Sequence, residues 1–594
     1  MSLPSNTFRR IQHEVDVCIV GGGMAGLTAA IGAARHGAGV ILMHDRPMLG
    51  GNASSEVRVH VCGADRHNRI PNMRETGILE EIRMENLHRN PRSSWGLWDT
   101  LLYEKTHYQD NLQLLLNCSC LDAETDDGLL TSITGWQLTT YTVHQVRAKI
   151  FIDASGDGIL APLTGAEHRI GREGRDEYNE PSAPPEADRK TMGMSICYQL
   201  RKCDSPQPFD PPEWACRFES CDDLPCGHPL QDCGYWWIET GGEQDSIHDT
   251  EQLRDELLKI AFGVWDHIKN YCPKTKADAA EYILEWVEFV PGKRESVRYV
   301  GQHVLTQNGI LGEGRFEDTV AYGGWTMDEH PPHGFWGKKQ GSDMPSAVHH
   351  KTPSPYGIPY RSLYSRTIDN LMCVGRCHSA THLGMSSTRV MGTGCSMGQA
   401  AGTAAAVATE QGLQPHEVLE QVDRLQQMLL YDDAYLPWVP QEFNHATLSA
   451  DLDASTGNPE PVRDGTNRPV DDDAHAWQHA PGDSLTMSWS TPQQINQVTL
   501  IADTALHKDP QMSWHHMLNG KPKAALDHMP EEMPRSFRVQ VRTDGEWQTV
   551  FETQENCRRL IRTRVEREVS AVRYTLRGTW GECDKTNLYA MYVD

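Results

Sequence analysis

The sequence predicts an α/β fold with an inserted α+β domain, followed by a C-terminal all-β domain. Three observations predict this arrangement. The apolar run at residues 15–20 leads into glycines and a helix of small residues, which is typical of a parallel sheet covered by helices. Residues 160–370 are dense in Trp, Tyr, Pro and His, as expected of an inserted substrate domain. From about residue 445, short alternating strands are separated by turns.

Residues 15–43 follow the order strand, glycine turn, helix, strand of a Rossmann-type nucleotide-binding unit. Gly21 permits the tight turn, Gly23 lets a pyrophosphate approach the backbone, and Gly26 lets the helix pack closely on the strand. The N-terminus of that helix offers unpaired N–H groups and a positive dipole end to phosphates. The unit therefore predicts a dinucleotide site.

The acid that usually binds the ribose is displaced by one position. The fingerprint expects Asp or Glu about 20 residues after the first glycine, and the chain has His44 followed by Asp45 and Arg46 there. We expect Asp45 to bind the ribose. His44 could donate to a ribose hydroxyl, and Arg46 could reach a phosphate or the adenine face.

Three later segments favour a flavin over a nicotinamide cofactor: the loop at residues 49–56, the buried strand and glycine turn at 150–158, and the strand at 371–376, which precedes a small-residue helix starting near 392. That helix is expected to pack at short range against a sheet and to point its N-terminus at a flavin carbonyl. The cofactor-binding residues expected from these segments are Gly50, Gly51, Asn52, Ser54, Ser55, Asp153, Gly156, Asp157, Gly375, Arg376, Gly394 and Met397.

Several longer stretches carry a family resemblance, among them DRPMLGGNASSEVR, RETGILEE, DASGDG, GYWWIETGG, PGKRESVRYVGQHVLTQ and VGRCHSATHLGMSSTRVMGTGCSMGQAAGTAAA. They resemble FAD-dependent oxidoreductases with a glutathione-reductase-like Rossmann fold, which are often found beside bacterial polysaccharide-degradation genes. The resemblance extends from about residue 14 to 440 and implies FAD as the cofactor. Members commonly carry QDRP where this chain has HDRP, which supports Asp45 as the shifted acid.

The C-terminal region resembles a second family. The stretches DGTNRP, INQVTLIADT and AVRYTLRGTW are similar to a discoidin or coagulation-factor type C jelly roll, a β-sandwich. Such modules often bind carbohydrate at loop tips, and a structural or docking role stays open. We therefore divide the chain into a discontinuous FAD-binding Rossmann domain (14–160 and 365–440), a substrate or cap domain (161–364) and a discoidin-like β-sandwich (445–594).

Candidate catalytic residues are those that could face the flavin. His378 and His382 lie between the strand at 371–376 and the small-residue helix, and His60 follows the loop at 49–56. A histidine suits the role of proton acceptor because its unperturbed pKa is near neutrality, although each could be a loop histidine bonded to the backbone. Arg389 could hold a carboxylate or stabilise reduced flavin.

These residues and the resemblance lead to one expected function and two alternatives. We expect an FAD-dependent oxidoreductase that oxidises an alcohol carbon of a carbohydrate or a related small molecule by hydride transfer to flavin N5. The first alternative is a redox-neutral flavin-dependent isomerase or lyase acting on a sugar. The second is a non-catalytic carbohydrate-binding protein on a flavoprotein scaffold, which the intact glycines of the cofactor segments argue against.

Charge and hydropathy exclude some partners. The chain has 55 Lys and Arg against 81 Asp and Glu, a formal net charge of −26, which argues against nucleic acid as a partner. No stretch reaches the ~18 uninterrupted apolar residues expected of a membrane span. We expect a small-molecule substrate, an electron acceptor that the sequence does not identify, and either a monomer or a homo-oligomer.

Sixteen cysteines are scattered without a disulfide framework, which favours a cytoplasmic protein, or a periplasmic one whose signal peptide has been removed. The densest tract contains Cys203, Cys216, Cys221, Cys226 and Cys233, with His228 among them. Its spacings do not match the paired CxxC knuckles of structural zinc sites. We therefore expect a loop with incidental thiols and no metal.

Overall fold

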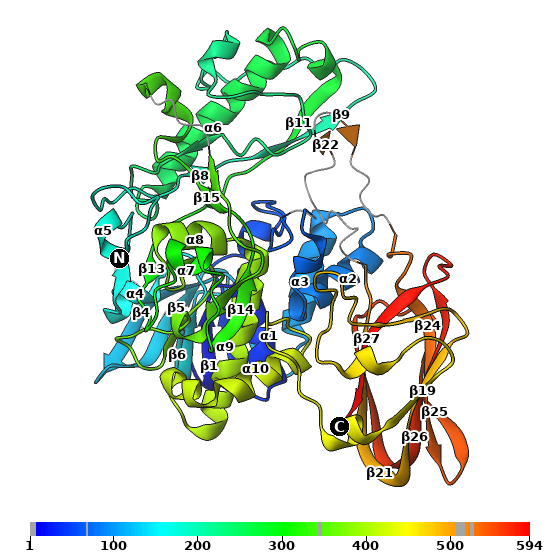
Figure 1. The fold of residues 1–594 in the computed structure, drawn as a ribbon. Coiled ribbons are helices and arrows are strands. Elements are labelled where there is room, and N and C mark those ends of the chain that lie inside the picture. Colours follow the sequence, from blue (N-terminus) through cyan, green and yellow to red (C-terminus); the bar gives the residue numbers. More distant parts are fainter. Residues whose placement is uncertain (1–7, 67–68, 342–346, 506–516, 519–520, 523–527) are drawn as a thin grey trace.

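The computed structural model describes residues 8–66, 69–341, 347–505, 517–518, 521–522 and 528–594 (Figure 1). A seven-stranded sheet organises the first part of the chain, in the order β3-β2-β1-β6-β5-β4, with β18 also pairing with β6. Its strands are β1 Arg9–Val20, β2 Val40–Met43, β3 Leu112–Leu115, β4 Cys118–Asp126, β5 Leu129–Gln137, β6 Thr142–Asp153 and β18 Leu371–Cys373.

The strands that position the site are parallel to one another. β1 pairs in parallel with β2 and with β6, β2 with β3, and β6 with β18, whereas β4 and β5 complete the sheet as antiparallel strands. The last four residues of β1 and all of β2 are buried, which explains their continuous apolar sequence. Because parallel strands end at the same edge, the loops after β1, β2, β6 and β18 meet there.

Helix α9 (Met391–Gln411) packs closely on α1 (Met24–Arg35). A Cβ atom at Gly398 would lie 2.1 Å from the carbonyl oxygen of Ala25, and one at Gly402 would lie 2.1 Å from that of Ala29. We expected this helix to make its short-range contact with a sheet, but the closest approach is to α1. The remaining helices of this part are α2 Ile78–Arg89, α3 Trp95–His107, α4 Leu160–Thr164, α8 His382–Thr388, α10 Val422–Tyr431 and α11 His445–Ser449.

The 217 residues between β6 and β18 form an insertion, and its described strands form small antiparallel sheets. At the top of Figure 1, helix α6 shares a core with the strands β8, β9 and β11 that includes Tyr198, Tyr235 and Trp265. The elements are β7 His168–Arg169, α5 Arg175–Tyr178, β8 Met194–Ser195, β9 Tyr198–Lys202, β10 Glu239–Thr240, α6 Thr250–Asp266, β11 Tyr282–Val287, β12 Gly292–Lys293, β13 Arg298–Tyr299, α7 Gln307–Leu311, β14 Thr319–Gly323, β15 Met327–Glu329, β16 Val348–His350 and β17 Tyr356–Pro359.

The C-terminal part is an antiparallel all-β module with its own core around Trp477, Val539 and Tyr574. Figure 1 shows it beside α2 and α3. Its strands are β19 Asp451–Ala454, β20 Trp477–His479, β21 Ser484–Ala502, β24 Pro534–Thr543, β25 Glu546–Thr553, β26 Leu560–Thr579 and β27 Thr586–Val593. The predicted fold class, a Rossmann-type α/β domain with an insertion and a C-terminal all-β module, is confirmed. Among the described residues, no helix is long and apolar enough to cross a membrane.

Candidate functional site

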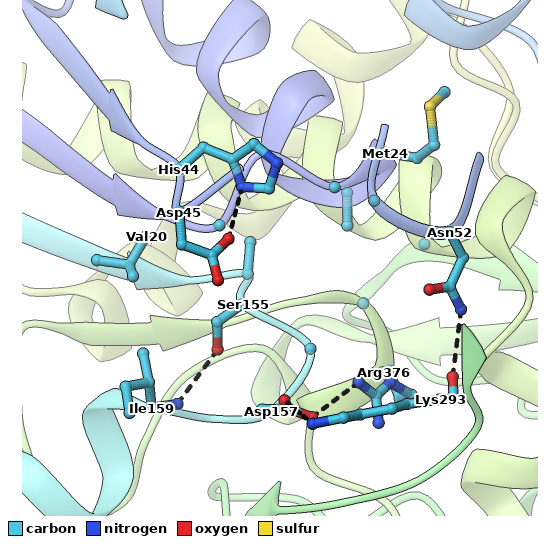
Figure 2. A pocket seen from close by; sticks show the side chains of 18 of the residues that line it. Val20, Met24, His44, Asp45, Asn52, Ser155, Asp157, Ile159, Lys293 and Arg376 are labelled. Atoms are coloured by element: carbon cyan, nitrogen blue, oxygen red, sulfur yellow. Dashed lines mark hydrogen bonds and ion pairs between the residues drawn. The ribbon is translucent and has the colours of Figure 1, made fainter. Parts of the chain in front are cut away.

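A cavity of about 620 Å³ lies where the parallel strands end (Figure 2). Its size falls in the range of small-molecule and cofactor pockets, roughly 300 to 1,000 Å³. The wall is built from the ends of β1 and β2, the turn after β6, the loop after β18, and the first residues of α1 and α9. This cavity is therefore at the sheet edge where the sequence predicts a nucleotide.

The three fingerprint glycines have different surroundings. Gly21 has a φ of +106°, and a Cβ atom there would lie 2.4 Å from the carbonyl carbon of Ala154. A Cβ atom at Gly26 would lie 1.9 Å from the Gly21 carbonyl oxygen, whereas at Gly23 it would meet nothing within 4 Å. Gly21 and Gly23 line the cavity and Gly26 does not. The backbone at Gly23 thus faces open space that a phosphate group could enter.

His44 is hydrogen-bonded to the glycine turn. The Gly22 N–H donates to its Nδ1 at 3.0 Å, and its Nε2 donates to the Met48 carbonyl at 2.9 Å. These bonds fix a neutral imidazole, and burial lowers the pKa of His44. Since both ring nitrogens bond to the backbone, the expectation that His44 donates to a ribose hydroxyl is wrong for this conformation.

Asp45 is the acid that remains available at the end of β2. It lines the cavity, its side chain is 61% exposed, and Oδ1 lies 3.4 Å from the His44 ring (Figure 2). Arg46 does not line the cavity, because its guanidinium forms two hydrogen bonds with the Glu56 carboxylate at 2.8 and 3.1 Å. The geometry supports Asp45 as a ribose ligand and gives Arg46 a structural partner instead of a phosphate.

The loop after β2 is joined to the glycine turn. The Gly50 N–H donates to the Gly22 carbonyl at 2.8 Å, and Gly50, Gly51 and Asn52 all line the cavity. Ser54 and Ser55 do not: the Ser54 hydroxyl accepts from Glu56 N–H, and the Ser55 N–H donates to Asp99. The prediction that the two serines contact the cofactor is therefore not supported.

The turn after β6 is flanked by two aspartates, one of which stabilises the turn while the other lines the cavity. Asp153 is fully buried and accepts hydrogen bonds from Tyr299 Oη and from the backbone of Ser155 and Leu160, so it shapes the turn without lining the cavity. Gly156 and Asp157 line it, and Figure 2 shows Asp157 between two cations.

Asp157 lies 2.7 Å from Lys293 Nζ and 3.0 Å from Arg376 Nη2. Burial raises the pKa of Asp157, but Arg376 and Lys293 lower it by more, so the carboxylate stays ionised. Lys293 belongs to β12 of the insertion and lines the cavity. Its carbonyl accepts a hydrogen bond from the Asn52 side chain at 3.2 Å. Lys293 was not among the expected cofactor-binding residues, although it lies in the stretch PGKRESVRYVGQHVLTQ.

Two helix N-termini reach the cavity. The α1 N-terminus has no side-chain cap and no acidic residue in its first turn, and Met24 and Ala25 are on the wall. Helix α9 contributes Met391 and Gly394, with Gly375 facing it, whereas Met397 is buried away from the cavity. The dipoles of both helices favour an anionic ligand between them.

Two of the four catalytic candidates do not reach the cavity. His378 is fully buried, its Nε2 lies 2.7 Å from Thr388 Oγ1, and burial lowers its pKa to about 3. His382 lies between two carboxylates, 2.9 Å from Glu295 and 3.7 Å from Glu329. Burial lowers the pKa of His382, but Glu295 raises it to about 9. His382 is thus an imidazolium that cannot accept a proton, and neither residue fits the base role expected of it.

The other two candidates, His60 and Arg389, line the cavity. Cys62 Sγ lies 3.0 Å from His60 Nε2, and the Cys62 carbonyl accepts from Gly392 N–H in the first turn of α9 at 2.7 Å. Arg389 immediately precedes that helix. Its Nη2 donates to Asp328, while its buried Nε has no hydrogen-bond partner in the described part of the chain. His60 and Arg389 therefore both lie near the N-terminus of α9.

The cavity wall carries more positive than negative charge. Its cations are Lys293, Arg294, Arg376 and Arg389, and its carboxylates are Asp45 and Asp157. The chain as a whole has a net charge of −26. A positive cavity in an acidic protein, with an open backbone cradle at Gly23, fits a ligand that carries phosphates.

The chain matches a known protein family over most of its length. A family model described as FAD dependent oxidoreductase matches residues 16–429, and no curated protein gave a significant match. A solved geranylgeranyl bacteriochlorophyll reductase-like protein from Thermoplasma acidophilum is 15% identical and has a TM-score of 0.29, with 71% of this chain and 85% of that chain covered.

Two carbohydrate-binding modules are similar to the C-terminal part. The family 32 module of EndoD from Streptococcus pneumoniae is 13% identical, covering 24% of this chain and 94% of that chain. Chitosan-binding module 1 of a Paenibacillus sp. IK-5 chitosanase/glucanase is 18% identical, covering 25% of this chain and 98% of that chain. Both TM-scores are 0.18, so no function follows from these similarities.

Proposed function

We propose a function from one premise: the chain belongs to the family of FAD dependent oxidoreductases. FAD is the cofactor of this family. We infer that this enzyme oxidises an alcohol carbon of a carbohydrate or a related small molecule. The observation that supports it best is that a histidine, His60, and an arginine, Arg389, both lie on the cavity wall near the N-terminus of α9.

The residues present fit FAD. The cradle at Gly23 and the N-terminus of α1 would hold the pyrophosphate, Asp45 would bind the ribose, and the N-terminus of α9 would lie at the flavin. Lys293 and Arg376, fixed by Asp157, add positive charge. When bound, FAD supplies the acceptor for the hydride that leaves the alcohol carbon.

His60 would take the hydroxyl proton of the substrate. Burial raises the pKa of the Cys62 thiol, so the thiol stays protonated and donates to His60 Nε2. The thiol has a second acceptor, the His60 carbonyl at 3.8 Å. When the S–H turns to that carbonyl, Nε2 can accept the substrate proton in its place.

Arg389 and Arg294 would select the substrate. Arg294 donates to Ser195 Oγ at 2.8 Å and lies 3.5 Å from Glu239, and the Nε of Arg389 has no hydrogen-bond partner among the described residues. Guanidinium groups on a buried wall bind carboxylates strongly. The proposal is therefore most specific for a sugar acid or another hydroxy acid derived from carbohydrate.

The test is anaerobic mixing of the purified enzyme with a panel of uronic acids and matched neutral sugars, followed through flavin absorbance. We expect sugar acids to bleach the flavin and to yield a stoichiometric carbonyl product. In His60→Gln, bleaching should slow by about 10² to 10⁴, the usual contribution of a general base, with unchanged FAD content. His303→Gln, which alters a histidine outside the cavity wall, should behave as the wild type.

Three results would contradict the proposal. Bleaching that is transient and leaves an isomerised sugar would favour the redox-neutral alternative. Bleaching by neutral sugars alone would remove the role of the arginines. An unchanged rate in His60→Gln would remove the proposed base. The non-catalytic alternative is set aside, because the chain is a member of an enzyme family.

We also propose a cytoplasmic location. The sixteen cysteines all lie in the described part of the chain, and none of them forms a disulfide there, which supports a reducing compartment. Disulfide mapping of the protein isolated from its native cells, with thiols blocked at lysis, tests this: native disulfides would contradict it.

A further inference from the structure

Two cysteines and two histidines meet in the insertion, far from one another in sequence. Cys221 and His228 come from an irregular loop, and His267 and Cys272 come from the end of α6. One ligand atom of each residue lies within 4.8 Å of the other three. None of the four lines the cavity described above, so the cluster is a separate feature.

The end of α6 has the geometry that brings its two residues together. After Asp266 the helix continues as a π-helical turn, His267–Tyr271, and the Cys272 N–H donates to the His267 carbonyl at 2.7 Å. This five-residue hydrogen bond widens the turn and places His267 and Cys272 on the same side. Such turns occur frequently at functional sites.

The distances match the edges of a metal-centred tetrahedron. Cys221 Sγ and Cys272 Sγ are 3.8 Å apart, His228 Nε2 and His267 Nε2 are 3.2 Å apart, and Cys272 Sγ is 3.4 Å from His228 Nε2. A tetrahedron edge is about 1.63 times the metal–ligand bond. Zinc bonds of about 2.3 Å to sulfur and 2.0–2.1 Å to nitrogen thus predict S–S edges of about 3.8 Å and N–N edges of about 3.3 Å.

Both histidines carry their proton on the nitrogen that faces away from the cluster. His267 Nδ1 donates to the Phe218 carbonyl at 2.8 Å, and His228 Nδ1 donates to the Cys226 carbonyl at 3.2 Å. A carbonyl can only accept, so in the neutral rings both Nε2 atoms present lone pairs to each other. Two lone pairs at 3.2 Å repel unless a cation lies between them, and such backbone bonds are those that orient zinc-bound histidines.

We propose that Cys221, His228, His267 and Cys272 bind one zinc ion in a structural site. Zn²⁺ binding would release the two thiol protons, and the resulting Cys₂His₂ centre would have no net charge, which suits its half-buried position. With four protein ligands the ion has no open position for a substrate. The proposal departs from the sequence-based expectation of no metal, because the second pair of ligands lies outside the cysteine tract.

The role of the ion would be to hold the irregular loop around residues 216–235 on α6. This loop has little regular secondary structure, and the ion would fix it next to the core that includes Phe218, Tyr235 and Trp265. Trp236 comes directly after this loop in the sequence. Its carbonyl accepts a hydrogen bond from Arg294, which lies on the cavity wall. Zinc removal would therefore loosen the insertion before it affects the cofactor.

The test is the metal and FAD content of the full-length protein, expressed with zinc and purified with a reductant, measured by elemental mass spectrometry. We expect one zinc per chain in the wild type and in Cys226→Ser, a control from the same tract. In Cys221→Ser and His228→Gln the zinc content should fall at least tenfold while FAD stays equimolar. Loading with Co²⁺ should give visible bands of tetrahedral cobalt beyond the flavin absorption in the wild type and in Cys226→Ser, but not in the two ligand variants.

Zinc-free wild-type protein that takes up neither Zn²⁺ nor Co²⁺ would overturn the proposal. So would zinc retained in both ligand variants, or a Cys221–Cys272 disulfide in the freshly isolated protein. If the variants do not fold, shown by loss of FAD, the cobalt spectrum of the wild type decides the question: octahedral bands would overturn it, and tetrahedral bands would support it.

Discussion

Gly23 and Gly26 are three residues apart in one turn and meet opposite steric conditions. At Gly26 a side chain would collide with the backbone of the same turn, so the residue serves the fold. At Gly23 nothing stands within 4 Å of the added carbon, and its φ of −64° is open to any residue. The fold therefore does not require a glycine at position 23, and we propose that it serves the ligand.

This difference predicts a variant that folds normally and binds FAD poorly. In Gly23→Ala the added methyl group enters the space that the pyrophosphate would occupy, so the Kd for FAD should rise at least about tenfold, or about 1.4 kcal/mol. The melting temperature of the apoprotein should stay within error of the wild type. Titration of apoprotein with FAD, followed by flavin fluorescence, measures the first quantity. Unchanged affinity would mean that the phosphates bind elsewhere.

Residue identities predicted the cofactor site better than the catalytic site. Most of the predicted glycines, though not Gly26, and Asp45 reach the cavity because their place at strand ends determines their position. The prediction that His378 and His382 face the flavin was wrong. They do lie between two segments that line the cavity, but that position in the sequence does not determine where their side chains point. Thr388 and Glu295, which hold these histidines, come from a separate helix turn and from the insertion.

At the scale of elements, the contact between α1 and α9 joins the two halves of the FAD-binding domain. Their backbones approach because Gly398 and Gly402, one helical turn apart, have no side chains. The sequence predicted α9 from its small residues, but it could not predict which element lies against it. The position of α9 depends on β18, which precedes it in the chain and pairs with β6 of the sheet after the insertion.

A single methyl group should disturb this contact. Gly402→Ala would place a carbon 2.1 Å from the Ala29 carbonyl oxygen, so we expect a loss of about 1 to 3 kcal/mol in the free energy of unfolding. Gly96→Ala is the matched control, because Gly96 is an exposed helical glycine whose nearest neighbour would be 3.9 Å away. It should be neutral or stabilising by up to about 1 kcal/mol. Urea unfolding of both variants measures the difference, and equal stabilities would contradict it.

At the scale of the molecule, buried arginines attach the β module to the FAD-binding domain. Arg559 at the base of the module lies 2.7 Å from Asp433, and Arg468 stacks on Tyr435 at 3.8 Å while donating to the Arg74 carbonyl. Burial raises the pKa of Asp433 to about 6 even with Arg559 beside it. The sequence predicted a separate module, and only the structure shows that it is docked through buried charge.

This interface predicts a rescue. Arg559→Met would leave the Asp433 carboxylate buried without its cation, which costs about 3 to 5 kcal/mol. Adding Asp433→Asn removes the charge, and Asn tolerates the positive φ of 61° at this position, so the double variant should recover at least half of the loss. Chemical unfolding of the three variants tests it. A double variant no more stable than Arg559→Met would show that the ion pair is not what holds the module.

We propose that FAD binds in the cavity at the sheet edge and that a substrate is oxidised there. The visible spectrum of the purified wild-type protein, before and after anaerobic addition of a sugar acid, tests it most directly, with the chromophore released by heat and quantified. We predict a flavin spectrum, one FAD per chain, and bleaching by the substrate. A colourless protein that added FAD cannot reconstitute would contradict the account.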